Sequence, residues 1–338
     1  MTLAKSNDPL ISIMIPAHKP IFFEAALRTA LAQTYPNFEI VICDDSGSDE
    51  IENTVKFFAP DPKLSYTRHP NPSGIAGNYR HLLQLARGQW GVFLDDDDVL
   101  YQPALATLLH AATTQRNIVL SYAACDLADL ESGEQRQVCA GTKPEILTGS
   151  QFWQNLQARP PVTVSVLFDL KVARQARIFE DSQNIKSGDW ESWLRIACHG
   201  NVAYTPAVTG CHRRHTQSYS QIPDLMMDVN NAVFIDRAIE YATKTGTIPP
   251  QVLKPWRRKM LAWYFTWIFS EHIPRSNYLS LRNACLALLR IDKVVALRIF
   301  ANIALLSSVI LSPFPQMHKR IRQLYRRIRF GSMQYANF

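Results

Sequence analysis

The sequence predicts an α/β fold, a doubly wound mixed sheet, followed by a helical C-terminal region. Three short apolar runs, Ile11–Ile15, Phe38–Cys43 and Trp90–Leu94, alternate with segments of helical periodicity. Continuous apolar runs are typical of parallel strands, because helices cover both faces of such a sheet. From about residue 224 onward the pattern is helical throughout, with no clear strand.

The first hundred residues alternate between strands and helices. A helix begins near Pro20, which suits a first helical turn, and Tyr35-Pro36-Asn37 stops it. Three elements separate the second apolar run from the third: a helix around 50–58, a strand at 64–68 and a helix at 76–87. In a sheet built this way, ligands bind beyond the carboxyl ends of the strands.

The segments after residue 100 complete the predicted sheet. We expect helices at 101–112, 150–157 and 187–199, a strand at 118–124 and a polar hairpin-like segment at 126–140. We therefore divide the chain into a sheet domain, residues 1–222, and a helical region, residues 223–338.

The composition is that of a globular protein with an uneven distribution of charge. The 338 residues include 7 Trp, 12 Tyr and 16 Phe, which excludes a disordered chain. Residues 254–338 hold 15 of the 36 basic residues and two of the 29 acidic ones, so this segment carries +13 and residues 1–253 carry −6. This asymmetry indicates an anionic surface as the partner of the basic segment.

The six cysteines are scattered through apolar stretches without a CxxC spacing, which favours buried thiols over disulfides or zinc. No basic segment precedes the first apolar run, so we expect no signal peptide and a cytoplasmic protein. The phosphate-binding patterns GxxxxGK[ST] and GxGxxG are absent from the sequence.

Two acidic clusters follow predicted strands. Asp95-Asp96-Asp97-Asp98 comes directly after the third apolar run, and Asp44-Asp45 ends the second. Four adjacent carboxylates repel one another, and a hard divalent cation with substrate phosphates would offset that cost. The plainer alternatives are a solvated capping turn for the first cluster and an Asx-turn for the second.

These residues resemble the motifs of family 2 glycosyltransferases, which have the GT-A fold, are inverting and include bacterial surface-polysaccharide enzymes. The motifs are Pro16-Ala17-His18 after the first strand, the stretch 44–49 and the stretch 93–98, and the resemblance covers roughly residues 9–220. It implies a Rossmann-like nucleotide-binding half and Mn²⁺ or Mg²⁺ on Asp97. It also implies contacts to a nucleotide-sugar donor: Pro16, Ala17, His18 and Asp45 at the base and ribose, Asp95 or Asp96 at the ribose or sugar, and Asn78 and Arg80 from the segment 73–80.

Two downstream segments resemble further parts of the same family. The stretch 187–195 is similar to the helix start that carries the catalytic base, which implies Asp189 as the base with Trp190 and Glu191 on the acceptor side. For Asp189 the alternative is a helix N-cap, and one residue can serve both roles. The stretch 211–215 implies that His215 completes the metal site or contacts the diphosphate, the alternative being a basic surface loop.

The C-terminal tail has the pattern of a basic amphipathic helix. Residues 318–330 place apolar side chains at helical spacing with six Lys and Arg on the other face, which suits an anionic membrane surface. The preceding apolar stretch from Ile299 to Leu311 is 13 residues long, short of the roughly 20 needed to span a bilayer. Upstream aromatic residues suit a membrane interface: Trp256, Trp263, Tyr264, Phe265, Trp267 and Phe269. The alternatives are a solvated helical end and an oligomer interface, so a homo-oligomer stays open.

The resemblance and the tail together predict a metal-dependent inverting glycosyltransferase on the cytoplasmic face of the inner membrane. The expected donor is a nucleotide sugar, with UDP favoured, and the acceptor is a hydroxyl of a surface polysaccharide or a polyprenyl-diphosphate-linked glycan. Two alternatives are a phosphatase of the HAD type using Asp95 and Asp97, and a non-catalytic membrane-docked binding module. Nucleic acid is not expected as a partner, because the basic residues lie apart from the acidic clusters in the sequence.

Overall fold

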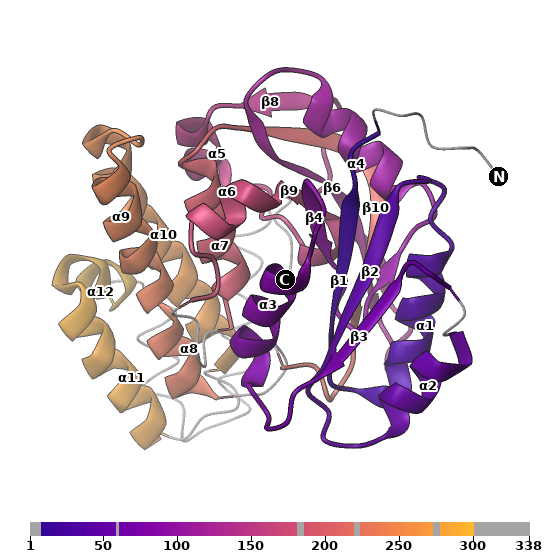
Figure 1. The fold of residues 1–338 in the computed structure, drawn as a ribbon. Coiled ribbons are helices and arrows are strands. Elements are labelled where there is room, and N and C mark those ends of the chain that lie inside the picture. Colours follow the sequence, from indigo (N-terminus) through magenta and orange to yellow (C-terminus); the bar gives the residue numbers. More distant parts are fainter. Residues whose placement is uncertain (1–7, 59–60, 181–185, 220–223, 273–277, 301–338) are drawn as a thin grey trace.

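The computed structural model describes residues 8–58, 61–180, 186–219, 224–272 and 278–300 (Figure 1). The strands of this part of the chain are β1 Ile11–Ala17, β2 Phe38–Asp44, β3 Leu64–Arg68, β4 Trp90–Phe93, β5 Val99–Leu100, β6 Ile118–Asp129, β7 Gln135–Val138, β8 Glu145–Leu147, β9 Val166–Asp169 and β10 Asn201–Arg214. They form one mixed sheet in the order β3-β2-β1-β4-β9-β6-β10-β5, with β7 paired to β6 and β8 to β10.

Helices cover both faces of the sheet and form a separate layer beyond it (Figure 1). In the sheet domain they are α1 Pro20–Leu31, α2 Glu50–Phe58, α3 Gly74–Leu85, α4 Ala104–Thr113, α5 Gly149–Asn155, the 3₁₀ turn Thr163–Ser165, α6 Leu170–Gln175 and α7 Gly188–Ala197. The helical region contributes α8 Leu225–Asn231, α9 Val233–Thr245, α10 Pro250–His272, α11 Tyr278–Ile291 and α12 Lys293–Phe300.

The first four strands confirm the predicted Rossmann-like half. β1 pairs in parallel with β2 and with β4, and β2 pairs in parallel with β3. Ala17 lies opposite Asp44, and Met14 lies opposite Phe93. Because these strands run in the same direction, the segments that follow their carboxyl ends come together at one edge of the sheet.

The second half of the sheet contains strands that the sequence pattern did not reveal. β9 is short and lies antiparallel between β4 and β6. β10 is 14 residues long, pairs in parallel with β6 and antiparallel with β5, and shifts register between Thr205 and Val208 and again before Cys211. Its mixture of buried and half-buried polar residues lacks the continuous apolar run that identified β1, β2 and β4.

The helical region shares its core with the sheet domain. A single apolar cluster extends from Met14 and Phe93 through Trp193 to Phe234 and Phe269. The four most buried aromatics of α10 are at most 4% exposed, and they are Trp256, Tyr264, Phe265 and Phe269. The expectation that these four side chains face a membrane is therefore wrong, since they are needed to fill the space between helices. Trp263 and Trp267 are half-buried against the same cluster.

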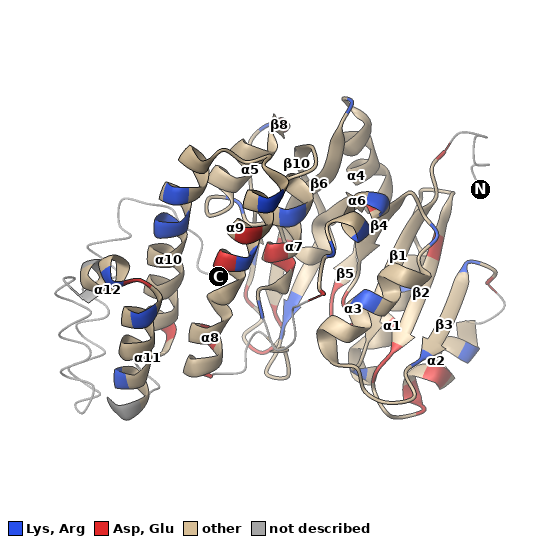
Figure 2. Ribbon diagram, turned by 60° about the vertical axis from the view of Figure 1, so that its left-hand side comes forward, with Lys and Arg blue, Asp and Glu red and all other residues tan. Residues whose placement is uncertain are grey.

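The charge asymmetry of the sequence is visible on the helical layer. Figure 2 shows Lys and Arg spread along α10 and α11, and Lys254, Arg258, Lys259, Arg282 and Arg290 are exposed. No helix of the described residues is both long and apolar enough to cross a membrane. The predicted amphipathic helix at 318–330 lies outside the described residues.

Candidate active site

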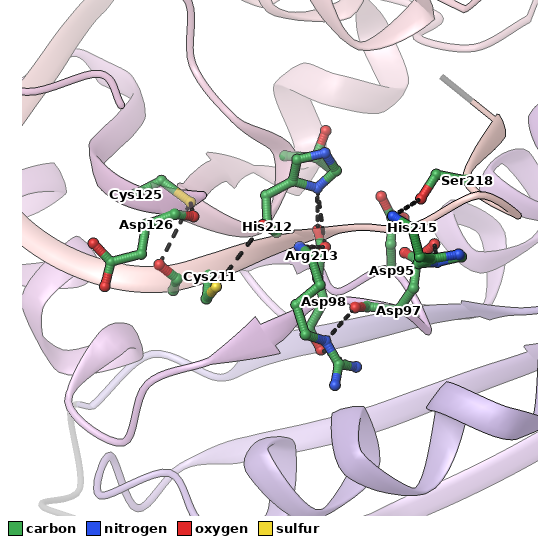
Figure 3. A network of polar contacts seen from close by, with 12 residues as sticks. Asp95, Asp97, Asp98, Cys125, Asp126, Cys211, His212, Arg213, His215 and Ser218 are labelled. Carbon is green, nitrogen blue, oxygen red and sulfur yellow. Dashed lines mark hydrogen bonds and ion pairs between the residues drawn. The ribbon is translucent and has the colours of Figure 1, made fainter. Parts of the chain in front are cut away.

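The acidic stretch Asp95–Asp98 lies between the end of β1 and the end of β10 (Figure 3). It reaches β10 because β5, which directly follows it, pairs with that strand through Val99 and Cys211. The long-range pairing of β10 thereby brings His212, Arg213 and His215 to acidic residues more than 110 positions earlier in the chain.

Asp96 and Asp97 are held by the segment that follows β1. The backbone N–H groups of His18 and Lys19 each donate to Asp96 Oδ2 at 2.5 Å, and the ammonium of Lys19 donates to Asp97 Oδ2 at 2.5 Å. Burial and the charge of Asp97 raise the pKa of Asp96 to about 6, although the two backbone donors oppose this. Burial opposes ionisation of Asp97 too, but the charge and hydrogen bond of Lys19 and the hydrogen bond of His215 leave its pKa lowered.

Asp98 is bound by two residues of β10. His212 Nδ1 lies 3.0 Å from Asp98 Oδ1, and the Arg213 N–H donates to the same oxygen at 3.0 Å. Burial would lower the pKa of His212, but the charge and hydrogen bond of Asp98, followed by the charges of Asp97 and Asp95, raise it to about 9. His212 is therefore an imidazolium at neutral pH. The guanidinium of Arg213 also donates through Nε to the Asp97 carbonyl at 2.5 Å.

Asp95 is paired with a buried phenol. The hydroxyl of Tyr79, on α3, donates to Asp95 Oδ1. Burial and the charges of Asp98 and Asp97 raise the pKa of Asp95 well above its ordinary value. Repulsion among the four carboxylates is thus offset by donors of the chain itself, of which the sequence analysis missed Lys19, Tyr79 and His212. Lys19 could have been suspected, because it directly follows the first motif.

The resemblance assigns a metal to Asp97, whose carboxylate already has two partners in the structure. Asp97 Oδ2 is shared by Lys19 and by His215 Nε2 at 3.1 Å. The Gln217 N–H donates to His215 Nδ1 at 3.2 Å, so the hydrogen-bond pattern places the proton of neutral His215 on Nε2, pointing to Asp97. No group of three or more His, Cys, Asp or Glu within the described ranges could hold a metal ion. One carboxylate with donor phosphates is a sufficient protein contribution for Mg²⁺ or Mn²⁺.

A polar hollow of about 210 Å³ lies next to the segment that follows β2. It is lined by Asp45, Gly47, Arg68, His69, Pro70 and Pro72. Asp45 is fixed there by the N–H groups of Ser73 and Gly74, at 2.8 and 2.9 Å. Asp44 instead accepts from the Ser46 N–H and the Tyr66 hydroxyl, so the Asx-turn alternative is right for this residue.

The remaining expected donor contacts lie near this hollow or on α3. Pro16 is half-buried, Ala17 is buried and His18 is exposed, with His18 Nδ1 3.1 Å from the Asp45 carbonyl. Asn78 donates to the Cys43 carbonyl at 3.0 Å, and its own side-chain oxygen is buried without a hydrogen bond. Arg80 donates to the Glu180 carbonyl at 2.6 Å.

Asp189 is the second residue of α7 and interacts electrostatically with Tyr79 and His212, which both contact the acidic stretch. The helix takes Ser187 as its N-cap, so Asp189 is a first-turn residue rather than the cap. The Thr163 hydroxyl donates to Asp189 Oδ2 at 3.4 Å. The charge of Asp189 also contributes to the raised pKa of Tyr79. Burial raises the pKa of Asp189 to about 6. Hydrogen bonds from the N–H groups of Trp190 and Asp189 and from the Thr163 hydroxyl, and the charge of His212, oppose this rise. A carboxylate of this pKa is ionised at neutral pH and can accept a proton.

The two residues after Asp189 contact the helical region. Trp190 is half-buried with its ring 5.6 Å from that of Trp263. Glu191 is 2% exposed and pairs with Arg195 and Arg237. The structure therefore places the Glu191 carboxylate inside an ion-pair network that joins α7 to α9.

Comparison with known proteins identifies relatives of the sheet domain. The family model described as glycosyl transferase family 2 matches residues 12–164. An Escherichia coli protein, the UDP-Glc:alpha-D-GlcNAc-diphosphoundecaprenol beta-1,3-glucosyltransferase WfaP, is 34% identical over 118 residues, which are 33% of this chain and 45% of that protein. This chain spans only about a third of the length of the first curated relatives that it matches.

Two solved structures share the fold over most of the chain. Staphylococcus aureus TarS 1–349 in complex with UDP-GlcNAc has a TM-score of 0.61 at 13% identity, covering 94% of this chain and 91% of that one. The mannosyltransferase PcManGT of Pyrobaculum calidifontis, in complex with GDP-Man and Mn²⁺, has a TM-score of 0.52 at 16% identity and covers 96% and 88% of the two chains.

Proposed function

This chain belongs to glycosyltransferase family 2, and on that premise we propose that it is an inverting transferase that uses a nucleotide-sugar donor. The single observation that carries the proposal is a pair of carboxylates, Asp97 and Asp189, that both interact electrostatically with His212. Asp97 is ionised and surrounded by cations, whereas Asp189 has a pKa near 6 at the start of α7. In such a pair, the carboxylate of low pKa can hold the metal of a diphosphate, and the carboxylate of raised pKa can accept a proton.

In the proposed reaction Asp189 takes the proton of the acceptor hydroxyl as that oxygen attacks the anomeric carbon. The leaving nucleoside diphosphate gains negative charge, and the cations Lys19, His212 and Arg213 are placed to stabilise it. A divalent cation on Asp97 would supply further charge neutralisation when bound with the donor. The PcManGT complex with Mn²⁺ supports this metal requirement.

We propose a UDP sugar as the donor and a polyprenyl-diphosphate-linked glycan as the acceptor. The name of WfaP specifies UDP-Glc and an undecaprenol-diphosphate sugar, and TarS binds UDP-GlcNAc. The hollow beside Asp45 is the proposed base site, with Arg68 and His69 at its rim. The protein would work as a peripheral protein on the cytoplasmic face of the membrane that carries such an acceptor.

The phosphatase alternative is disfavoured by the environment of Asp95. That mechanism needs Asp95 as an ionised nucleophile, but Tyr79 hydrogen-bonds it and its neighbours raise its pKa well above the ordinary range. A binding module without catalysis is the weaker alternative, because it gives no role to the half-buried Asp189 and its raised pKa.

The test is a comparison of nucleotide sugars by binding and by turnover. Thermal unfolding of the purified protein with UDP, GDP and dTDP sugars, each with Mn²⁺ or with EDTA, should show stabilisation by UDP sugars that needs the metal. A ligand at 100 times its Kd stabilises the folded state by about 2.7 kcal/mol. Release of UDP with a polyprenyl-diphosphate GlcNAc acceptor would then establish transfer. No stabilisation by any nucleotide sugar, together with no nucleotide release, would refute the proposal.

A further inference from the structure

Two buried ion-pair networks join the start of α7 to the helical region, one on each side of Asp189 along the chain. The first begins at Lys186, three residues before Asp189, and the second at Glu191, two residues after it. The partners of Lys186 and Glu191 lie on α8 and α9 of the helical region.

The first network is centred on Asp228 of α8. The Lys186 ammonium lies 2.8 Å from Asp228 Oδ1, and His272 Nε2, at the end of α10, lies 2.6 Å from Asp228 Oδ2. Asp228 is 5% exposed. The Lys186 N–H also donates to Asn231 Oδ1 at 2.7 Å, so α8 holds both the backbone and the side chain of Lys186.

The second network is centred on Glu191 within α7. Its carboxylate accepts from Arg195 one turn later and lies 3.3 Å from Nε of Arg237 on α9. This network fixes the rotation of α7 about its axis, because Glu191 and Arg195 lie on the face of α7 that is turned toward α9. The first network fixes the chain just before that helix begins.

Asp228 matters for the site because its carboxylate lies 2.8 Å from the ammonium of Lys186, three residues before Asp189. Breaking a buried pair by removing one partner is costly, since the remaining charge must move to water or lose its proton. The Lys186 side chain is 10% exposed, so loss of this pair favours a shift of Lys186, and with it of the start of α7, toward water. A displacement of about 1 Å at a reacting group can reduce a rate 100-fold.

We infer that Asp228 is a positioning residue for the base Asp189 and that α8, with the end of α10, therefore forms part of the catalytic unit. This inference rests on the proposed function for its effect on turnover. Its structural part, the anchoring of residues 186–192 by Asp228, stands independently of that function.

The test compares Asp228→Asn with the matched variant Asp236→Asn in the full-length protein. Asp236 also lies in the helical region, but it is 48% exposed and pairs with Arg257 away from α7. We expect Asp228→Asn to lower kcat about 10- to 100-fold with the KM for the donor within twofold of wild type. Asp236→Asn should leave both values unchanged. An unchanged kcat in folded Asp228→Asn, or a loss confined to donor KM, would overturn the inference.

Two further measurements keep the inference testable if one variant fails to fold or the wild type shows no turnover. Lys186→Met should lower kcat as Asp228→Asn does, and the double variant should lose less than the product of the single losses, because one pair is removed in each. Hydrogen exchange of the 186–192 amides should be at least tenfold faster in either variant, with the amides of β1 and β4 unchanged. Equal exchange in wild type and variants would overturn the anchoring even if transfer is never observed, whereas failed transfer with faster exchange would count against the proposed function alone.

Discussion

The ammonium of Lys19 lies 2.5 Å from Oδ2 of Asp97, the carboxylate to which we assign the metal, although 78 residues separate the two in the sequence. Burial would lower the pKa of Lys19, but the charge and hydrogen bond of Asp97 raise it, so the ammonium stays protonated. A divalent cation and an ammonium repel each other and cannot share one oxygen at contact distance. We therefore predict that a metal at Asp97 Oδ2 would compete with Lys19, whose ammonium would then be available to the donor diphosphate.

Lys19→Met should for this reason bind Mn²⁺ more tightly than wild type when no donor is present. Removal of the competing ammonium should improve the affinity about tenfold, which corresponds to ~1.4 kcal/mol. The measurement is a Mn²⁺ titration followed by electron paramagnetic resonance. Lys56→Met, which removes an exposed lysine paired with Glu52, is the control. Equal or weaker binding in Lys19→Met would contradict the competition.

Asp189→Asn should abolish transfer while leaving donor binding intact. The amide has the shape of the carboxylate but cannot accept the acceptor proton, and loss of a general base costs about 10²- to 10⁴-fold in rate. Turnover and the Kd for the UDP sugar should be measured on the same preparation, with Asp236→Asn as the control. Full activity in Asp189→Asn would remove this residue from the role of base.

Thr163→Val should move the acid limb of the pH–rate profile to higher pH. The Thr163 hydroxyl donates to ionised Asp189 and lowers its pKa, so its removal should raise that pKa above its present value of about 6. Because the base acts when ionised, the variant should lose rate near pH 6 and approach wild type near pH 8. Thr209→Val, which removes a buried hydroxyl without a hydrogen bond, should leave the profile in place. An unmoved acid limb in Thr163→Val would contradict the assignment.

His212→Asn should destabilise the metal-free protein in a pH-dependent way. The folded-state pKa of about 9 lies above the ordinary 6.5, so the charged pair with Asp98 contributes its full stability below pH 6.5 and loses it as pH rises through 9. The difference in unfolding free energy between wild type and variant should be at most about 3 kcal/mol larger at pH 6 than near pH 10, where only the pH-independent cost of losing the ring remains.

Urea unfolding in EDTA across this pH range measures that difference. Burial lowers the pKa of His199, so His199→Asn should show a constant difference between pH 6.5 and 9 and serves as the control. A constant difference for His212→Asn as well would show that its charge does not stabilise the fold.

Truncation from about residue 317 onward should release the protein from membranes. The pattern at 318–330 supplies six basic side chains, each worth about 1 kcal/mol near an anionic surface, and an apolar face. Co-sedimentation with vesicles containing anionic lipids compares the full chain with the truncated one. If the truncation leaves membrane binding unchanged, the tail is not the docking surface, and another surface, such as the exposed basic residues of α10 and α11, would have to bind the membrane.

Local sequence signals were sufficient to predict where a residue lies when its position depends only on its own strand or helix. The apolar runs of β1, β2 and β4 predicted the parallel half and placed Pro16, Asp45 and Asp97 at its edge, because strand ends in a parallel sheet converge whatever their spacing. The periodicity after residue 224 predicted helices for the same reason. The aromatics of α10 show the limit of such signals, since an apolar side chain has the same pattern whether it meets lipid or a protein core.

The partners of the acidic residues were decided by tertiary structure alone. β10 carries no periodic signal, yet its pairing with β5 and β6 sets the distance from His212 and Arg213 to Asp98. Likewise, only the fold brings Asn231 of α8 to the backbone of Lys186, just before α7. Charges and burial act through space, so a pKa near 6 for Asp189 or near 9 for His212 depends on residues that no sequence spacing identifies. The sequence by itself determined the family and the positions of the acidic residues along the chain. The fold decided which groups contact those residues and shift their pKa values, because these contacts join segments far apart in the sequence.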